Sequence, residues 1–228
     1  MSERSRPAVK ICGLVRAEDA ALAARLGADH VGSIFAGGPR LIDAATARAN
    51  VAAARAAVPG HPPHAVGVMG AQTPDAIARL AEEATLDAVQ LHADPDADAV
   101  AAVRAAWGGE VWAVLRIAGT ALPPQTAGLF DVADAVVLDA KVDGTQLGGT
   151  GVALDWDGLA AALAPFRGRG RAALVLAGGL RPENVAVAIR ALRPDAVDVS
   201  SGVERAPGVK DPDRLAAFLA AARSATTS

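Results

Sequence analysis

Short runs of aliphatic and β-branched residues alternate with alanine-rich stretches along the whole chain. The runs predict strands at residues 8–12, 29–35, 64–69, 87–92, 110–117, 134–139, 172–177 and 196–200. The stretches between them predict helices, because alanine and leucine favour helix while valine and isoleucine favour strand. Each run is almost continuously apolar, which is typical of parallel strands that are covered on both faces. The pattern therefore predicts eight βα units.

Eight βα units in 228 residues favour a closed (β/α)₈ TIM barrel, which typically takes about 250 residues. An open, doubly wound sheet is the alternative, but it suits eight strands in so short a chain less well. We expect one α/β domain over residues 1–228, with residues 226–228 as a frayed tail. Thr73, Asp94 and Asp211 each precede a proline and are predicted to cap helices, because proline fits the first helical position.

Composition and charge exclude several classes of function. The net charge is −3, without a basic block, so we expect no nucleic-acid surface. One cysteine excludes an intrachain disulfide framework and fits a reducing compartment. The first ten residues lack the apolar region of a signal peptide, and no uncharged stretch reaches membrane-spanning length. We expect a cytoplasmic protein that does not bind membranes.

Polar residues stand at the carboxyl ends of four predicted strands. These are Cys12, His92, Asp139 and Ser200. Successive side chains of a strand point to opposite faces, and the outward face of a barrel strand packs on helices. The polar residues therefore have inward parity, at the end of the barrel where barrel enzymes place their active sites. Clustered titratable groups in a concave mouth favour a functional site over a structural one.

Lys10 and Asp198 share this inward parity, one alternation further from the rim. Lys10 has two interpretations: a cation that lowers the pKa of Cys12, or a buried charge paired with an acid such as Asp198. Asp198 is expected to orient the rim rather than to react. His92 fits a histidine of the barrel interior and a substrate contact equally well.

Two small-residue loops follow the last two strands. Gly178 and Gly179 come after the seventh strand, with Pro182 predicted in the first turn of the next helix. Ser200, Ser201 and Gly202 come after the eighth strand. Small residues let ligand oxygens approach backbone N–H groups, and loops seven and eight are the usual phosphate site of barrels. The glycines of residues 148–151 are interpreted as a mobile lid, since the next helix does not follow them directly.

Other residues with possible chemistry favour structural roles. His61 and His64 flank two prolines without a nearby acidic partner, so we expect no metal site. Trp107, Trp112 and Trp156 are expected to be packing residues.

Six motifs occur in order over almost the whole chain: KICG (10–13), GGPR (37–40), VQLH (89–92), VLDA (137–140) with GGTG, LAGGLRPENV (176–185), and DVSSGVE (198–204) with PGVKD. In this order they resemble the phosphoribosylanthranilate isomerase family of tryptophan biosynthesis. The resemblance implies a barrel of the ribulose-phosphate-binding type, without metal or organic cofactor. It also implies an Amadori rearrangement of N-(5-phosphoribosyl)anthranilate to 1-(2-carboxyphenylamino)-1-deoxyribulose 5-phosphate.

The resemblance implies a role for each matching residue. Cys12 corresponds to the general base, Asp139 to the general acid and Arg40 to the arginine associated with the anthranilate group. The glycines and serines of the last two loops correspond to the phosphate site. The expected partner is a phosphorylated small molecule, and the expected state is a monomer or a homodimer.

Two other functions stay open. One is a related isomerase that acts on the aminoaldose of histidine biosynthesis, or on both substrates; that chemistry normally has an aspartate where Cys12 stands. The other is a non-catalytic phosphate-binding barrel, which would need neither Cys12 nor Asp139. The presence of both residues favours the enzyme.

Overall fold

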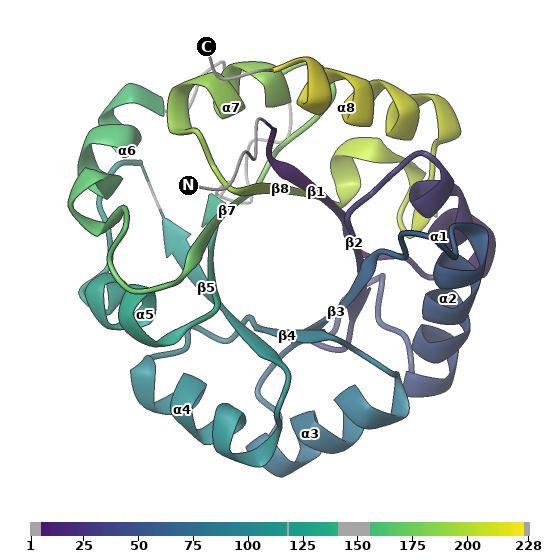
Figure 1. Ribbon diagram of the computed structural model, residues 1–228, viewed down its shortest axis with the longest axis horizontal. Helices are drawn as coiled ribbons and strands as arrows, with labels where there is room; N and C mark the ends of the chain where they lie inside the picture. The colour runs from purple at the N-terminus through teal and green to yellow at the C-terminus, as the bar shows by residue number, and fades with distance from the viewer. Residues whose placement is uncertain (1–5, 118, 141–155, 226–228) are drawn as a thin grey trace.

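The computed structural model describes residues 6–117, 119–140 and 156–225. Eight parallel strands form the inner wall of a ring, and helices surround them (Figure 1). The strands are Ala8–Ile11 (β1), His30–Ile34 (β2), His64–Met69 (β3), Ala88–Leu91 (β4), Glu110–Ile117 (β5), Ala135–Ala140 (β6), Ala173–Ala177 (β7) and Ala196–Val199 (β8). The helices are Ala17–Arg25 (α1), Ala44–Ala57 (α2), Pro74–Glu83 (α3), Ala97–Ala106 (α4), Thr126–Val132 (α5), Trp156–Leu163 (α6), Val185–Leu192 (α7) and Pro212–Ser224 (α8).

The pairing of β8 with β1 closes the barrel, with Lys10 opposite Asp198 in register. The predicted (β/α)₈ fold is confirmed, and the open doubly wound sheet is excluded. Two short 3₁₀ helices, Ala164–Phe166 and Ser201–Val203, and a small antiparallel pair, Glu204–Ala206 (β9) and Val209–Lys210 (β10), were not predicted. None of the described helices has the length and apolar character needed to span a membrane. The proposed lid at residues 148–151 and the tail at 226–228 lie outside the described residues.

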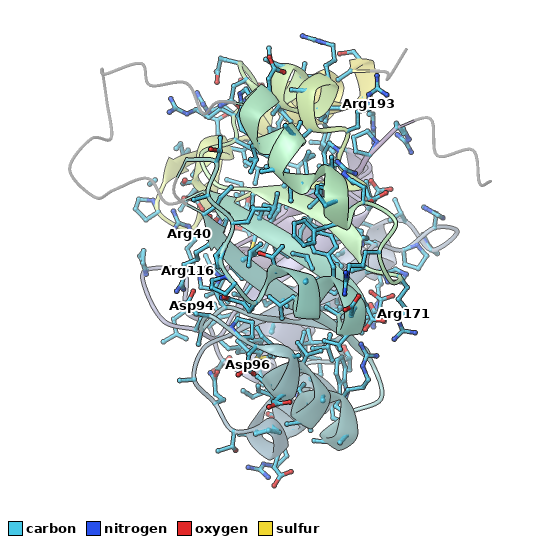
Figure 2. All side chains as sticks on the ribbon, turned by 90° about the vertical axis from the view of Figure 1, so that its left-hand side faces the viewer. Arg40, Asp94, Asp96, Arg116, Arg171 and Arg193 are labelled. Carbon is cyan, nitrogen blue, oxygen red and sulfur yellow. The ribbon has the colours of Figure 1, made fainter. Side chains whose placement is uncertain are left out.

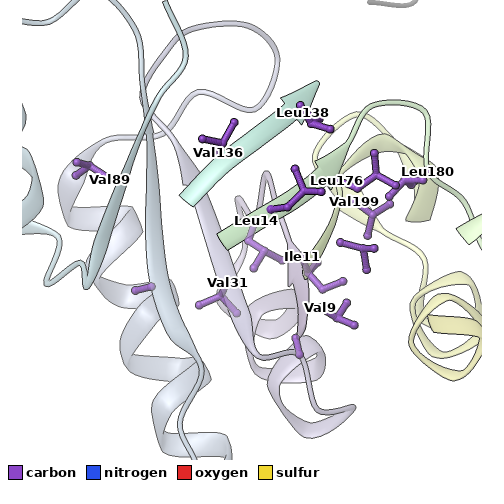
Figure 3. Packing of buried hydrophobic residues seen from close by; sticks show 14 of the residues in the cluster. Val9, Ile11, Leu14, Val31, Val89, Val136, Leu138, Leu176, Leu180 and Val199 are labelled. Atoms are coloured by element: carbon purple, nitrogen blue, oxygen red, sulfur yellow. The ribbon is translucent and has the colours of Figure 1, made fainter. Parts of the chain in front are cut away.

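Buried apolar side chains form two layers. One lies between the strands and the helices and includes Val9 and Ile11 (Figure 3). The other lies inside the barrel and includes Val114, Val137 and Trp112. The predicted alternation is therefore correct: odd positions of β1 face the helices, while Lys10 faces the interior. The three tryptophans belong to these packed layers, as expected.

Helix starts follow the expected chemistry at two of three positions. The side chain of Thr73 accepts a hydrogen bond from the N–H of Ala76, and that of Asp211 accepts from two N–H groups of α8. The prediction that Asp94 caps a helix is wrong. Asp96 caps α4, whereas Asp94 has a φ of 48° and pairs its carboxylate with Arg116.

The position predicted for Pro182 is also wrong. Pro182 lies in a turn, and α7 begins only at Val185. The side chain of Asn184 explains the delay, because it closes the turn locally. Its Oδ1 accepts from the N–H of Arg181 at 2.8 Å, and its Nδ2 donates to the carbonyl of Gly179 at 3.0 Å.

Four aspartates hold the amino ends of the strands together. Asp29, Asp87, Asp134 and Asp195 each directly precede an even-numbered strand, and three of them begin the sequence DAV. Their Oδ2 atoms accept hydrogen bonds from the N–H groups of Val9, Ala65, Val111 and Leu174 at 2.7–2.9 Å. Each aspartate N–H donates in return to the carbonyl of the same residue. We call these two-way contacts the aspartate clamps.

The aspartate clamps predict a specific loss of stability. Asp29→Ala removes the acceptor for the N–H of Val9 and should lower the free energy of unfolding by about 1–2 kcal/mol. Asp29→Asn keeps an acceptor oxygen and should lose less than half of that. Urea denaturation of both variants measures the difference. Equal stability of the alanine variant and the unmodified protein would contradict the role of the clamp.

Candidate active site

A cavity of about 650 Å³ opens at the carboxyl ends of the strands. Arg40, Arg116 and Asp94 lie at this end of the molecule, and Arg171 lies at the opposite end (Figure 2). The cavity wall contains most residues that the sequence singled out: Cys12, Arg40, His92, Asp139, Gly178, Gly179, Asp198, Ser200, Ser201 and Gly202. Lys10 lies beneath this wall, within the barrel. A larger hollow of about 850 Å³ at the amino ends contains His30, His61 and His64 but none of these residues.

Cys12 directly follows β1, and its side chain is buried, with 5% of its surface exposed. Its N–H donates to the carbonyl of Val199 at 2.8 Å, which fixes the rim to β8. The neighbouring strand offers space only because Gly32 has no side chain: a Cβ there would lie 3.0 Å from the Sγ of Cys12. Burial raises the pKa of the thiol, while the nearby Lys10 and Lys210 ammonium groups lower it and Asp198 raises it. The cations thus offset part of the cost of forming a thiolate here.

Lys10 is fully buried below Cys12. Its Nζ donates to the Oδ2 of Asp198 at 2.8 Å and to the Oε1 of Gln90 at 2.9 Å. Burial alone would lower the pKa of Lys10, but the attraction of Asp198 outweighs it and the net shift is upward. Lys10 therefore stays charged inside the barrel. Both sequence interpretations hold together, since the cation is paired with Asp198 and also acts on Cys12.

Asp139 projects into the cavity from β6. Its Oδ2 lies 3.9 Å from the Nε2 of His92. Burial raises the pKa of the Asp139 carboxyl above its usual value, against the opposing effect of His92. Burial lowers the pKa of His92, so its neutral form is favoured. A carboxyl group that keeps its proton is suited to act as a general acid.

Three buried polar atoms around the cavity have no hydrogen-bond partner within the described parts of the chain. They are the Nδ1 of His92, the Oδ1 of Asp198 and the Oγ of Ser200. Buried polar atoms are nearly always paired in folded proteins. These three are therefore candidates for contacts with a ligand, and the contact interpretation of His92 gains support.

Glycine residues bring the last two loops close to the rim. Gly178 and Gly179 have φ values of 88° and 63°, in the left-handed region that glycine adopts at low cost. A Cβ on Gly202 would collide with the carbonyl oxygen of Leu180, so the two loops touch at that point. Gly13, with a φ of 68°, would place a Cβ 2.5 Å from the Cδ of Arg40 and 2.8 Å from the Oγ of Ser200.

Sequence reasoning missed three charged residues of the site. Arg116 lines the cavity from β5, in register with Asp139, and donates to the carbonyl of His92 at 2.6 Å. Its inward parity could have revealed it. Glu204 and Lys210 lie in the DVSSGVE and PGVKD motifs and pair with each other at 2.8 Å. Arg40, expected as a ligand for a substrate carboxylate, pairs with Glu204 at 2.6 Å.

We looked for side chains that could bind a metal ion among the residues that the structure describes. Among the described residues, no group of three or more His, Cys, Asp or Glu side chains is placed to hold a metal ion.

A thiol and a carboxyl of raised pKa line one cavity at the carboxyl ends of the strands, which is where enzymes of the (β/α)₈ class place their active sites. The family model described as "N-(5'phosphoribosyl)anthranilate (PRA) isomerase" matches residues 9–221. The chain belongs to this family of isomerases.

Individual relatives agree with this assignment. The N-(5'-phosphoribosyl)anthranilate isomerase of Afipia carboxidovorans is 40% identical over an alignment of 230 positions, which covers 96% of this chain and 91% of the relative. The phosphoribosyl anthranilate isomerase of Thermotoga maritima has a TM-score of 0.80 and 34% identity, and the match covers 95% of this chain and 98% of that one. A further structure of the Thermotoga enzyme describes monomers generated from a dimeric protein.

A solved isomerase in complex with reduced 1-(o-carboxyphenylamino)-1-deoxyribulose 5-phosphate is also similar. Its TM-score is 0.77 at 32% identity, and the match covers 95% of this chain and 98% of that one. The ligand of that protein combines a phosphate, a polyol and a carboxylated ring.

The charges around Cys12 predict opposite shifts in its reactivity. Lys10→Met removes a cation and should raise the pKa of the thiol, while Asp198→Asn removes an anion and should lower it. The alkylation rate with iodoacetamide against pH reports Cys12 alone, because it is the single cysteine of the chain. Shifts of the same sign in both variants would contradict the electrostatic account.

Proposed function

We propose that this chain catalyses the Amadori rearrangement of N-(5-phosphoribosyl)anthranilate, as the isomerase of tryptophan biosynthesis. One observation carries the proposal. A buried thiol directly after β1 and a half-buried carboxyl on β6 line the same cavity, so a substrate lying across the barrel mouth can contact both. Family membership supports the reaction. The raised pKa of Asp139 supports its role as the acid, and the cations near Cys12 offset part of the upward shift that burial causes in the pKa of the thiol.

The reaction begins at Asp139 in this mechanism. Its carboxyl donates a proton to the ring oxygen of the ribose, the bond from that oxygen to C1′ breaks, and a Schiff base forms with the anthranilate nitrogen. The raised pKa of Asp139, caused by burial, keeps the proton available for this step. Donation by a positioned acid contributes about 10²–10⁴-fold to the rate.

Cys12 then acts as the general base. Its thiolate removes the proton from C2′, the electron pair forms the C1′–C2′ double bond, and the positive nitrogen becomes neutral. The resulting enolamine takes up a proton at C1′ and loses its hydroxyl proton to give the ketone. Lys10 and Lys210 favour the thiolate that this step needs. A purely structural role as a buried small side chain would not account for the place of Cys12 at the rim of the cavity.

The two ends of the substrate have separate candidate contacts. We propose that Gly178, Gly179, Ser200, Ser201 and Gly202 hold the phosphate, since their backbone N–H groups and hydroxyls lie where small residues allow close approach. Arg40 is the proposed ligand of the anthranilate carboxylate. The unpaired atoms of His92 and Asp198 are the proposed contacts of the sugar hydroxyls.

The remaining expectations complete the proposal. The single cysteine fits a reducing compartment such as the cytoplasm. The dimeric relative from Thermotoga makes a homodimer as compatible with this family as a monomer. A net charge of −3 without a basic block gives no support for a nucleic-acid partner.

The proposal is tested by generating phosphoribosylanthranilate in situ and measuring the rate at which its fluorescence is lost. The unmodified protein should be active, and Cys12→Ser and Asp139→Asn should each lower kcat by about 10²–10⁴-fold. Circular dichroism of the variants controls for folding. A folded but inactive protein that still binds phosphate esters would support the non-catalytic barrel. Turnover of the histidine-pathway aminoaldose would support the dual isomerase.

A further inference from the structure

Glu204 connects two cations next to the cavity. Its side chain is 5% exposed and accepts hydrogen bonds from the Nε and Nη2 of Arg40 at 2.8 and 2.6 Å. The fully buried Nζ of Lys210 donates to the same carboxylate at 2.8 Å and to the carbonyl of Ser200 at 3.1 Å. A continuous chain of polar contacts therefore runs from Arg40 through Glu204 and Lys210 to the loop after β8.

The guanidinium of Arg40 keeps one edge available. Guanidinium carries five N–H donors in a rigid plane. Glu204 occupies the edge formed by Nε and Nη2, and the described residues offer no acceptor for Nη1. Arg40 lines the cavity, and Gly13 leaves space for its side chain on the other side. A second carboxylate can bind the edge formed by Nη1 and Nη2 in the two-pronged geometry that arginine favours.

Lys210 changes the net charge of the group formed by Arg40, Glu204 and Lys210. Arg40 and Glu204 alone form a neutral pair, which attracts an anion weakly. Lys210 adds a second cation to the same carboxylate, so the group carries one net positive charge. An anchored arginine also loses less side-chain entropy when it binds a ligand than a free arginine on a loop.

We infer that Glu204 is a positioning residue that aims Arg40 at the carboxylate of the anthranilate ring, with Lys210 as the counter-charge that keeps the group cationic. The inference rests on the proposed function, which assigns that carboxylate to Arg40. It goes beyond that assignment because it makes ring recognition depend on a residue that does not touch the ligand. The alternative is a purely structural ion pair between Glu204 and Lys210.

The binding of two ligands distinguishes a positioning role of Glu204 from a purely structural one. One is reduced 1-(o-carboxyphenylamino)-1-deoxyribulose 5-phosphate, and the other is the same compound without the ring carboxylate. Calorimetry gives the ratio of their dissociation constants for each variant. The unmodified protein should prefer the carboxylated ligand by about 10–100-fold, as for hydrogen bonds to a charged group. Arg40→Met should abolish this preference.

The decisive variant is Glu204→Met combined with Lys210→Met. It removes both partners of the buried pair, so no buried charge is left uncompensated, and the group keeps one positive charge on Arg40. Positioning predicts that the preference falls at least about 5-fold, because the anchor is lost at constant charge. A preference equal to that of the unmodified protein would overturn the inference.

Glu204→Asp is the second variant and keeps the counter-charge of Lys210. Its shorter side chain cannot reach the full Nε and Nη2 edge, so the preference should fall at least about 3-fold; an unchanged value would again count against the inference. Glu183→Gln is the matched control, because it removes an acidic charge that pairs with Arg214 at 3.7 Å and leaves Arg40 untouched. Failure of the proposed function gives a different result: the unmodified protein would bind both ligands equally or not at all.

Discussion

The ion pair between Lys10 and Asp198 is the interaction on which the active end of the barrel depends. It joins β1 to β8 across the closing pair of strands, and Gln90 extends it to β4. A fully buried ammonium is tolerated only where an anion and hydrogen-bond acceptors surround it. The interior of the barrel thus holds a charged pair among its apolar side chains, and the thiol of Cys12, the proposed base, lies above that pair.

Two acid–base groups with opposite needs share one buried space. Desolvation favours the protonated form of both the thiol and the carboxyl, which suits Asp139 and opposes Cys12. Nearby cations lower both pKa values: Lys10 and Lys210 act on the thiol, and Arg116 and Lys10 act on the Asp139 carboxyl. The positions of Lys10, Lys210 and Arg116 therefore set the fraction of molecules in which Cys12 is a thiolate while Asp139 is protonated.

The sequence was sufficient for the barrel and for the residues that strand parity places at the rim. Cys12, Asp139 and Asp198 follow from a period of two and from the position of a strand end. Glu204 and Lys210 could not be found in this way. They lie in the short strands β9 and β10, which are too brief to show a period. Their role depends on the contact of Glu204 with Arg40, which is 164 residues away in the chain. The start of α4 was also ambiguous from the sequence, because Asp94 and Asp96 stand two residues apart and an aspartate at either position can cap a helix.

The aspartate clamps divide the barrel into four similar parts. Each clamp joins an odd strand to the even strand that follows it, β1 to β2, β3 to β4, β5 to β6 and β7 to β8, and none joins an even strand to the next odd one. A break in the chain at residues 107–109, between α4 and β5, leaves every clamp within a continuous segment. Each half of the barrel therefore contains two complete aspartate clamps. Separate halves, or a chain circularly permuted at this point, would keep the residues of all four clamps within continuous segments.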